Sequence, residues 1–395
     1  MQTRCLASLL VLVALLAPAV GQQSWKFQTS NPPSKLGVDS KALDEAVALV
    51  ADLVVQDEIL GAVVLVARGR SILLHDAFGA RDVGGKIAMH KDALFRMASN
   101  TKAVTAAAVL TLVDQGKVDL DDPVFKWLPT WDRGDAKKVT VRHLLTHTSG
   151  LRIRSLFLYP LMKQSKQYPD APNLVLECKR FAMVGPKAEP GTTYSYSNPG
   201  YNTLAAIVEL ASGVSFEQYC TECFYKPLAM ADTSHHESRA DLARMSVVVR
   251  RKESKQWQAR WTPGDKATVP FVRGSGGLIS SAIDYAKFCR MILDGGACQD
   301  DHLLSRQLVT AATKNQISHI QDVEYGFGWR IDDGGSFSHS GSDGTFVWCD
   351  PSRDLIGMVL TQTQGSKKLG AVRAEFRKIV TRACLPTDVV HDARK

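Results

Sequence analysis

The sequence lacks the short motifs that mark several common catalytic and cofactor sites. It contains no Gly-x-Ser-x-Gly pentapeptide, which excludes the nucleophile elbow of α/β-hydrolases. It contains no His-Glu-x-x-His, and the run His235-His236-Glu237 lacks the spacing that places two zinc ligands on one helix face, so we expect a solvated loop there. No glycine-rich loop of the kind that cradles phosphate precedes a helix. The sequence therefore predicts neither a metal nor an organic cofactor.

The chain also lacks a hydrophobic run long enough to span a bilayer. Its most apolar stretch, residues 6–16, is shorter than the roughly 20 residues that a transmembrane helix needs. The stretch follows Met1-Gln2-Thr3-Arg4 and precedes Ala17-Pro18-Ala19-Val20-Gly21, which is the basic, apolar, small-residue order of a secretory signal. We therefore expect residues 1–21 to be a signal peptide cleaved after Gly21. The mature chain would be exported, to the periplasm or the extracellular space, with no stable membrane span.

Charge of one sign is not concentrated along the chain. The 48 Lys and Arg residues exceed the 40 Asp and Glu residues, giving a formal charge of +8, but the basic residues are scattered. One modest cluster comprises Arg250, Arg251, Lys252 and Lys255. A solvated loop accounts for this cluster more simply than a nucleic-acid groove does, so we expect no nucleic-acid partner.

Cysteines are few, but export would expose them to oxidants. Seven follow the predicted signal: Cys178, Cys220, Cys223, Cys289, Cys298, Cys349 and Cys384. Some disulfides are consistent with export, and the odd number leaves at least one thiol unpaired. The sequence leaves the pairing open. Cys220 and Cys223 have the spacing of a zinc-binding pair, but no second ligand pair stands at a suitable distance, so we expect no metal site.

Apolar periodicity at both ends of the chain predicts one antiparallel sheet flanked by terminal helices. A helical pattern begins at Asp39-Ser40 and is followed by strand-like runs at residues 62–67 and 72–78, which Arg68-Gly69-Arg70 joins as a hairpin. Near the other end, strands are predicted at residues 328–331, 336–339, 345–349 and 355–361, and a closing helix at residues 369–384.

Helical patterns dominate the middle of the chain. They cover residues 99–115, residues 141–148 ending at Gly150, and residues 201–211 ending near Gly213. The chain shows no internal repeat and no low-complexity linker. We therefore predict a mixed α/β (α+β) fold, with a sheet domain built from residues 22–93 and 271–395 and a mostly helical domain from residues 94–270. The functional site is expected in the cleft between them.

Ser99 and Lys102 form the first candidate pair of reactive residues. The segment from Phe95 to Lys102 leads into a long apolar helix, so Ser99 lies at or within its first turn and Lys102 lies on the same helix face. Burial and the positive end of the helix dipole favour a neutral lysine amine, which can accept the serine proton. The pair alone is also typical of an N-capping serine followed by a surface lysine, so it needs support from elsewhere.

Two distant motifs supply that support. The turn-rich loop from Pro190 to Gly200 contains Tyr196-Ser197-Asn198 at the entry to another helix, where two polar side chains can project into a cleft. A phenol near an ammonium group can relay a proton, and an amide can orient both lysine and substrate. The second motif, Ser338-His339-Ser340-Gly341-Ser342-Asp343-Gly344-Thr345, follows a strand, and its small residues allow a substrate to approach the backbone closely.

Together these elements resemble the β-lactamase-related serine hydrolases, the group that holds class C β-lactamases, D-Ala-D-Ala carboxypeptidases, D-aminopeptidases and family VIII carboxylesterases. The resemblance covers residues 40–384 and includes the Val139 to Leu151 and Gly276 to Ser281 segments. From the residues themselves we interpret these two segments as scaffold, with a cap at Thr140, a helix stop at Gly150 and a tight Gly-Gly turn. His147 is expected to be structural because it lies at a helix end.

The resemblance implies a β-lactamase/penicillin-binding-protein-like fold and a role for each motif. It makes Ser99 the nucleophile, Lys102 its base, Tyr196 the proton relay and Asn198 a substrate-orienting amide. It makes the backbone N–H groups of Ser99 and Ser342 the oxyanion hole, and it places His339 and Gly341 in the substrate-binding strand.

One departure from the group's pattern bears on the substrate. His339-Ser340-Gly341 stands where many β-lactamases have Lys-Thr-Gly, and a neutral histidine is a weaker, pH-dependent partner for a substrate carboxylate. The resemblance therefore implies a covalent acyl-enzyme mechanism on small-molecule carboxylic esters, without a cofactor. D-peptides, as in D-Ala-D-Ala carboxypeptidases and D-aminopeptidases, and β-lactams or other amides are the alternatives. The alternative from another class is an inactive binding protein on the same fold.

Overall fold

A computed structural model describes residues 27–28, 36–151, 159–237, 241–252, 256–267, 269–299 and 301–385. The predicted signal at residues 1–21 lies outside the described residues. Among the residues that are described, no helix is both long and apolar enough to cross a membrane.

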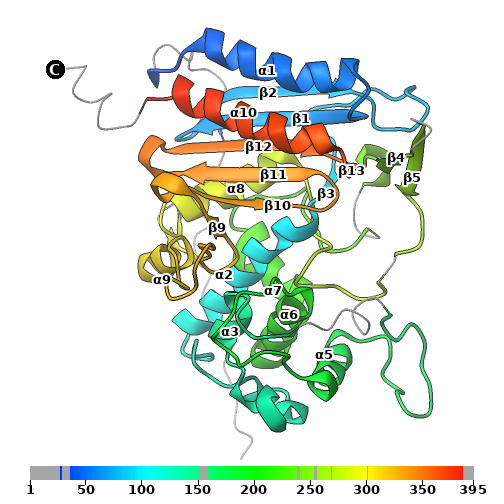
Figure 1. Cartoon of the computed structure of the whole chain (residues 1–395), viewed down its shortest axis with the longest axis vertical. Coiled ribbons are helices and arrows are strands. Elements are labelled where there is room, and N and C mark those ends of the chain that lie inside the picture. Colours follow the sequence, from blue (N-terminus) through cyan, green and yellow to red (C-terminus); the bar gives the residue numbers. More distant parts are fainter. Residues whose placement is uncertain are drawn as a thin grey trace, which may run out of the picture.

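Figure 1 shows the helices and strands of the chain. The helices are α1 (Ser40–Val55), α2 (Thr101–Asp114), α3 (Val141–Leu145), α5 (Leu174–Val184), α6 (Asn198–Ser212), α7 (Phe216–Cys220), α8 (Ala282–Leu293), α9 (Arg306–Ala312) and α10 (Lys367–Ala383). The strands are β1 (Gly61–Arg68), β2 (Ser71–Gly79), β3 (Phe95–Arg96), β4 (Val248–Arg251), β5 (Trp257–Trp261), β6 (Ile279–Ser280), β7 (Ala297–Cys298), β8 (Asp301–His302), β9 (Arg330–Ile331), β10 (Phe337–Ser340), β11 (Thr345–Asp350), β12 (Leu355–Thr361) and β13 (Thr363–Gln364).

The predicted antiparallel sheet is present and joins the two ends of the chain. Its strands lie in the order β2-β1-β12-β11-β10-β9, and Val64 of β1 pairs with Val359 of β12. Every residue of β1 and of β12 is buried, because helices cover both faces of the sheet at its centre. This explains why both strands have continuous apolar runs instead of alternating ones.

Helices α1 and α10 pack against each other and cover one face of the sheet (Figure 1). α1 begins where the Asp39 carboxylate accepts hydrogen bonds from the backbone N–H groups of Lys41 and Ala42. The Arg68 guanidinium donates to the carbonyl oxygens of Leu36 at 3.0 Å and Leu385 at 2.7 Å. The segments that flank the two terminal helices are therefore fastened to the same buried side chain.

The other face of the sheet packs on α8 and leads into the helical part of the molecule, which surrounds α2 (Figure 1). Residues 101–112 of α2 are all buried, so this helix has no polar face. A helix that is apolar all round belongs in the interior, and Lys102 is consequently 0% exposed.

The predicted mostly helical middle region also contains two strands that the sequence did not indicate, at residues 248–261. Strands β4 and β5 pair there, and β4 also pairs in parallel with β13. The basic cluster therefore does not form the expected loop throughout, since Arg250 and Arg251 end β4, and Arg251 forms an ion pair with Asp57 at 2.6 Å. Lys255 lies outside the described residues.

Helix α3 also ends earlier than predicted, at Leu145 instead of Thr148. The backbone turns at His147, which has a φ of 59°, and the Thr148 N–H donates to the His143 carbonyl oxygen. Gly150 has another role: a Cβ there would lie 2.3 Å from the Ala188 carbonyl oxygen, so glycine permits the close approach of that segment.

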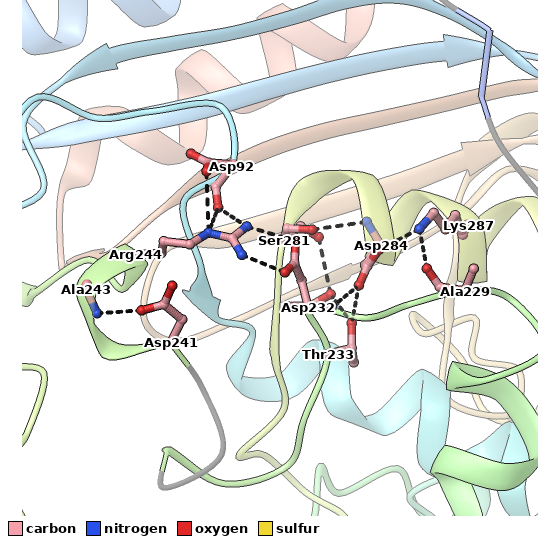
Figure 2. Close-up of polar contacts among 11 residues, drawn as sticks. Asp92, Ala229, Asp232, Thr233, Asp241, Ala243, Arg244, Ser281, Asp284 and Lys287 are labelled. Atoms are coloured by element: carbon pink, nitrogen blue, oxygen red, sulfur yellow. Dashed lines mark hydrogen bonds and ion pairs between the residues drawn. The ribbon is translucent and has the colours of Figure 1, made fainter.

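A polar cluster anchors α8 and the loops beside it (Figure 2). Arg244 donates to both carboxylate oxygens of Asp232, at 2.6 and 2.8 Å, and to the Asp92 carbonyl oxygen. The Asp232 N–H in turn donates to the carboxylate of Asp284 on α8, which also pairs with Lys287. Because β6 directly precedes α8 and pairs with β3, the cluster steadies the strand that leads to Ser99.

Candidate functional site

Ser99 lies in a tight turn between β3 and α2. Residues Ala98–Asn100 form a 3₁₀ turn, so the α-helix starts two residues after Ser99. The preceding residue Ala98 has a φ of 46°, a left-handed conformation that is strained for any residue with a side chain. The Asn100 side chain holds the turn by donating to Thr345 Oγ1 at 2.8 Å. The turn is therefore bound directly to the start of β11.

Lys102 directs its amine at Ser99. Its Nζ lies 3.1 Å from Ser99 Oγ, 2.8 Å from Asn198 Oδ1 and 2.7 Å from the Ser275 carbonyl oxygen. Burial lowers the pKa of Lys102 well below its usual 10.5, and the positive charge of Arg273 lowers it further. The site therefore favours the neutral amine.

The three contacts of Lys102 match the needs of a neutral amine. Such an amine has two N–H groups and one lone pair. The Ser275 carbonyl and the Asn198 amide oxygen can only accept, so they take the two N–H groups. The lone pair then faces Ser99 Oγ and can accept its proton.

Tyr196 approaches the same two side chains from the start of α6. The Lys102 Nζ lies 4.8 Å from the centre of the Tyr196 ring, and Tyr196 shares a hydrogen bond with Ser99. Burial raises the pKa of the phenol well above 10, whereas the hydrogen bond with Ser99 opposes the rise. Although 44% of the residue is exposed, its hydroxyl is thus kept protonated and able to donate.

Helix α6 positions both Tyr196 and Asn198. Ser197 caps it by accepting a hydrogen bond from the Gly200 N–H at 3.1 Å. The cap places Tyr196 just before the helix and Asn198 in its first turn, on either side of Ser197. The helix begins three residues earlier than the predicted start at Tyr201.

His339 is buried on β10 and remains neutral. Its Nδ1 donates to the Ser340 carbonyl oxygen at 3.0 Å, which leaves Nε2 to accept from the Tyr325 hydroxyl at 3.4 Å. Burial lowers the pKa of His339 to about 3, and the charge of Lys102 acts in the same direction. That His339 binds a substrate carboxylate more weakly than a lysine stays a prediction. The low pKa of His339 argues against the expected pH dependence near neutrality.

The end of β10 lies directly against the Ser99 turn. A Cβ on Gly341 would lie 2.6 Å from the Met97 carbonyl oxygen and 3.1 Å from Ala98 Cβ, so only glycine allows this approach. Ser342 follows and is exposed, and its N–H has no hydrogen-bond partner in the described part of the chain. This amide is available to a ligand, as the predicted oxyanion hole requires.

A cavity of 560 Å³ opens beside Tyr196 and His339. Its wall combines aromatic rings with cations: Tyr194, Tyr325, Phe346, Arg330, Arg373 and Arg377. A larger cavity of 1080 Å³ adjoins it and shares Tyr194 and Tyr325, but residues 99, 102 and 196 do not line it. Of these three residues only Tyr196 lines the smaller cavity, which makes it the candidate for the substrate.

Metal ligands do not cluster in the described residues, where no three His, Cys, Asp or Glu side chains converge on one point. The seven cysteines of this part of the chain carry free thiols. His235 departs from its predicted place in a solvated loop, because it is 2% exposed and hydrogen-bonded to the Tyr225 hydroxyl.

Comparison with known proteins identifies the family. A sequence model described as Beta-lactamase matches residues 46–382. The chain belongs to the beta-lactamase family. Both the predicted relationship and the predicted fold class are thereby confirmed.

Relatives of this beta-lactamase family member include enzymes and proteins without a named activity. Protein Rv1367c of Mycobacterium tuberculosis (strain ATCC 25618 / H37Rv) is 29% identical over 344 residues, covering 76% of this chain and 85% of the relative. Esterase EstB of Burkholderia gladioli is 28% identical over 393 residues, covering 89% and 98%. The solved structure of EstCE1, titled a hydrolase with promiscuous acyltransferase activity, has a TM-score of 0.72 at 21% identity, covering 86% of this chain and 98% of that one, and shows the shared fold.

The beta-lactamase family member contains site residues that sequence reasoning missed. Ser275 supplies a carbonyl acceptor to Lys102, and Thr345 fastens the Ser99 turn. A backbone carbonyl leaves no signature in a sequence, although Ser275 directly precedes the Gly276-Gly277 motif that was interpreted as scaffold. Thr345 was inside a quoted motif, but only the fold shows that it contacts Asn100.

Proposed function

We propose that this protein is a serine hydrolase that cleaves small-molecule carboxylic esters through an acyl-enzyme on Ser99. The observation that carries the proposal is the set of three contacts made by the buried Lys102 amine, which leaves a lone pair facing Ser99 Oγ. Membership of a hydrolase family supports the reaction class. The three reactive side chains also argue against a binding protein, which would need no buried base beside a serine.

The reaction proceeds by two displacements. Lys102 accepts the Ser99 proton while Oγ bonds to the ester carbonyl carbon, and the resulting oxyanion receives hydrogen bonds from the backbone N–H groups of Ser99 and Ser342. The carbon–oxygen bond to the alcohol then breaks, and the alcohol takes its proton through Tyr196. Water enters, loses a proton through the same pair and attacks the acyl carbon, which releases the acid and restores Ser99.

Two observations favour esters over β-lactams. The neutral His339 stands where a permanently charged lysine would bind a β-lactam carboxylate. The relative that spans 89% of this chain is named an esterase. We further propose that the protein acts after export, from the residue order at its N terminus.

A fluorophosphonate probe tests the nucleophile. Wild type should be labelled, and labelling should disappear in Ser99→Ala. Ser340→Ala is the matched control, because Ser340 lines the cavity beside Tyr196 and its labelling should persist. A folded wild type that resists the probe, or a Ser99→Ala variant that still reacts, would overturn the proposal.

The substrate class needs a separate comparison. p-Nitrophenyl esters, a D-Ala-D-Ala peptide and a chromogenic cephalosporin should be assayed side by side with wild type and Ser99→Ala. We expect Ser99-dependent turnover of the esters with the highest kcat/KM. A higher value for the peptide or the cephalosporin would keep the nucleophile but reject the ester assignment.

A further inference from the structure

His147 occupies a backbone position that usually belongs to glycine. It directly follows the C-terminal cap of α3, with a φ of 59°. The Thr148 N–H donates to the His143 carbonyl at 2.9 Å and the His147 N–H to the Leu144 carbonyl at 3.4 Å, which is the Schellman arrangement of a helix end. Glycine, or failing that asparagine, is preferred there, so a histidine adopts a strained conformation. Backbone strain of this kind is often found where the side chain makes a specific functional contact.

The side chain of His147 is bonded to the segment that carries Tyr196. The side-chain Nδ1 accepts from the Ser197 N–H at 3.0 Å, and the backbone carbonyl oxygen of His147 accepts from the Ser195 N–H at 2.8 Å. These two bonds flank Tyr196 on both sides. The imidazole centre also lies 4.3 Å from the centre of the Tyr196 ring. His147 therefore fixes both the backbone and the ring of Tyr196.

These bonds specify the protonation state of the ring. A backbone N–H can only donate, so Nδ1 must be unprotonated and the proton must be on Nε2. His147 is 0% exposed, and its Nε2 has no hydrogen-bond partner among the described residues. Burial lowers the pKa of His147 well below 6.5, and any positive charge on Lys102 or His339 would lower it further. The groups around the ring are Lys102 on α2, His339 on β10, Tyr201 on α6, and Tyr194, Tyr196 and Tyr325.

We propose that His147 is a positioning residue that holds the Tyr196 hydroxyl at Ser99, and that it does so as the neutral Nε2–H tautomer. The inference rests on the proposed function of Ser99. If Nδ1 were protonated, its N–H would face the Ser197 N–H. Two donors cannot bond to each other, so the segment that carries Tyr196 would be released. It would also add a positive charge beside Lys102.

Three variants separate positioning from a merely structural role. His147→Asn introduces a residue that favours this left-handed backbone conformation. Its Oδ1 lies near the position of Nδ1 and can accept from the Ser197 N–H. His147→Gly keeps the helix end but removes the acceptor. His143→Asn is the matched control, because His143 lies in α3, which His147 follows, and its ring accepts from the Thr140 N–H instead of the Tyr196 segment.

We expect kcat for a p-nitrophenyl ester to fall about 10- to 100-fold in His147→Gly with KM nearly unchanged, since misplacement of a reacting group by about 1 Å has effects of this size. His147→Asn should restore most of kcat, and His143→Asn should match wild type. In a Tyr196→Phe background, His147→Gly should cause little further loss. Wild-type kcat in His147→Gly, no rescue by asparagine, or an undiminished loss in the Tyr196→Phe background would overturn the proposal.

A second measurement does not depend on activity. Nitrogen NMR of protein labelled with ¹⁵N-histidine should show His147 as the neutral Nε2–H tautomer from about pH 7 to pH 5, because its pKa is lowered well below 6.5. An Nδ1–H tautomer or an imidazolium in this range would overturn the inference. Failure of the proposed function would instead appear as unlabelled Ser99 in the fluorophosphonate experiment.

Discussion

At the scale of single residues, desolvation governs the chemistry around Ser99. Burial lowers the pKa values of Lys102, His147 and His339, so the base and both imidazoles favour their neutral forms. Burial raises the pKa of Tyr196, which keeps the phenol as a donor. The negative charge that develops on a substrate oxygen would therefore be stabilised by backbone N–H dipoles and not by charged forms of these side chains.

Removal of one hydroxyl tests the proton relay. Tyr196→Phe should lower kcat/KM for an ester by about 10²- to 10⁴-fold, the usual contribution of a general acid or base. Because 44% of the residue is exposed, the free energy of unfolding should change by less than about 0.5 kcal/mol. Urea denaturation and steady-state kinetics measure both quantities. Tyr159→Phe is the control, because Tyr159 is exposed and does not line the cavity. Equal activity in the two variants would remove Tyr196 from the mechanism.

The sequence indicates the reactive side chains better than it indicates the residues that position them. Ser99, Lys102, Tyr196 and Asn198 were found because each belongs to a polar motif at the start of a helix, and the structure brings all four together. His147 was assigned to the scaffold from its place at a helix end. Its bond to Ser197 joins residues 50 positions apart, and no local pattern indicates such a contact.

At the scale of secondary-structure elements, the site depends on the contact between β10 and the Ser99 turn. Thr345 Oγ1 accepts from the Asn100 side chain and donates to the Met97 carbonyl oxygen at 3.1 Å, so β11 holds this turn. Gly341 leaves the space that these bonds require. The geometry of the predicted oxyanion hole thus depends on packing between a strand and a turn whose bonded residues, Asn100 and Thr345, are 245 residues apart in sequence.

Glycine substitutions on two elements test this contact. In Gly341→Ala the added Cβ would lie 2.2 Å from Thr345 Oγ1, so we expect a loss of about 1–3 kcal/mol in unfolding free energy and slower fluorophosphonate labelling. In Gly370→Ala on α10 the Cβ meets nothing within 4 Å, and helix propensity should add about 0.5–1 kcal/mol. The urea concentration at the midpoint of unfolding measures the change in stability of each variant. Midpoints that shift in the same direction would contradict the assigned packing.

Element boundaries show where periodicity alone fails. The terminal helices and the strands β1, β2, β11 and β12 followed their apolar patterns closely. Strands β4 and β5 were missed because only Val248, Val249 and Trp261 of their nine residues are buried, which leaves little alternation to detect. Helix α3 ended early because tertiary bonds to His147 outweighed its apolar pattern.

At the scale of the whole molecule, the fold encloses three neutral histidines. His147, His235 and His339 are 0%, 2% and 7% exposed. His147 and His339 lie on either side of Tyr196, whereas His235 lies beside Phe216 and Tyr225. Burial lowers the pKa of each below the unfolded value of 6.5, and that of His235 and of His339 to about 3. The unfolded chain therefore binds more protons than the folded chain below about pH 6.5.

This difference sets the direction of the pH dependence of stability. Since the folded pKa values are depressed, the stabilising contribution is present above pH 6.5 and is lost as pH falls toward about 3. Each histidine should contribute up to about 1.4 kcal/mol per pH unit within that window. Urea midpoints should therefore fall from about pH 7 to pH 5, and His235→Gln, which keeps an acceptor for the Tyr225 hydroxyl, should make the slope shallower. A His235→Gln slope equal to the wild-type slope would contradict the neutral state assigned to His235 in the folded protein.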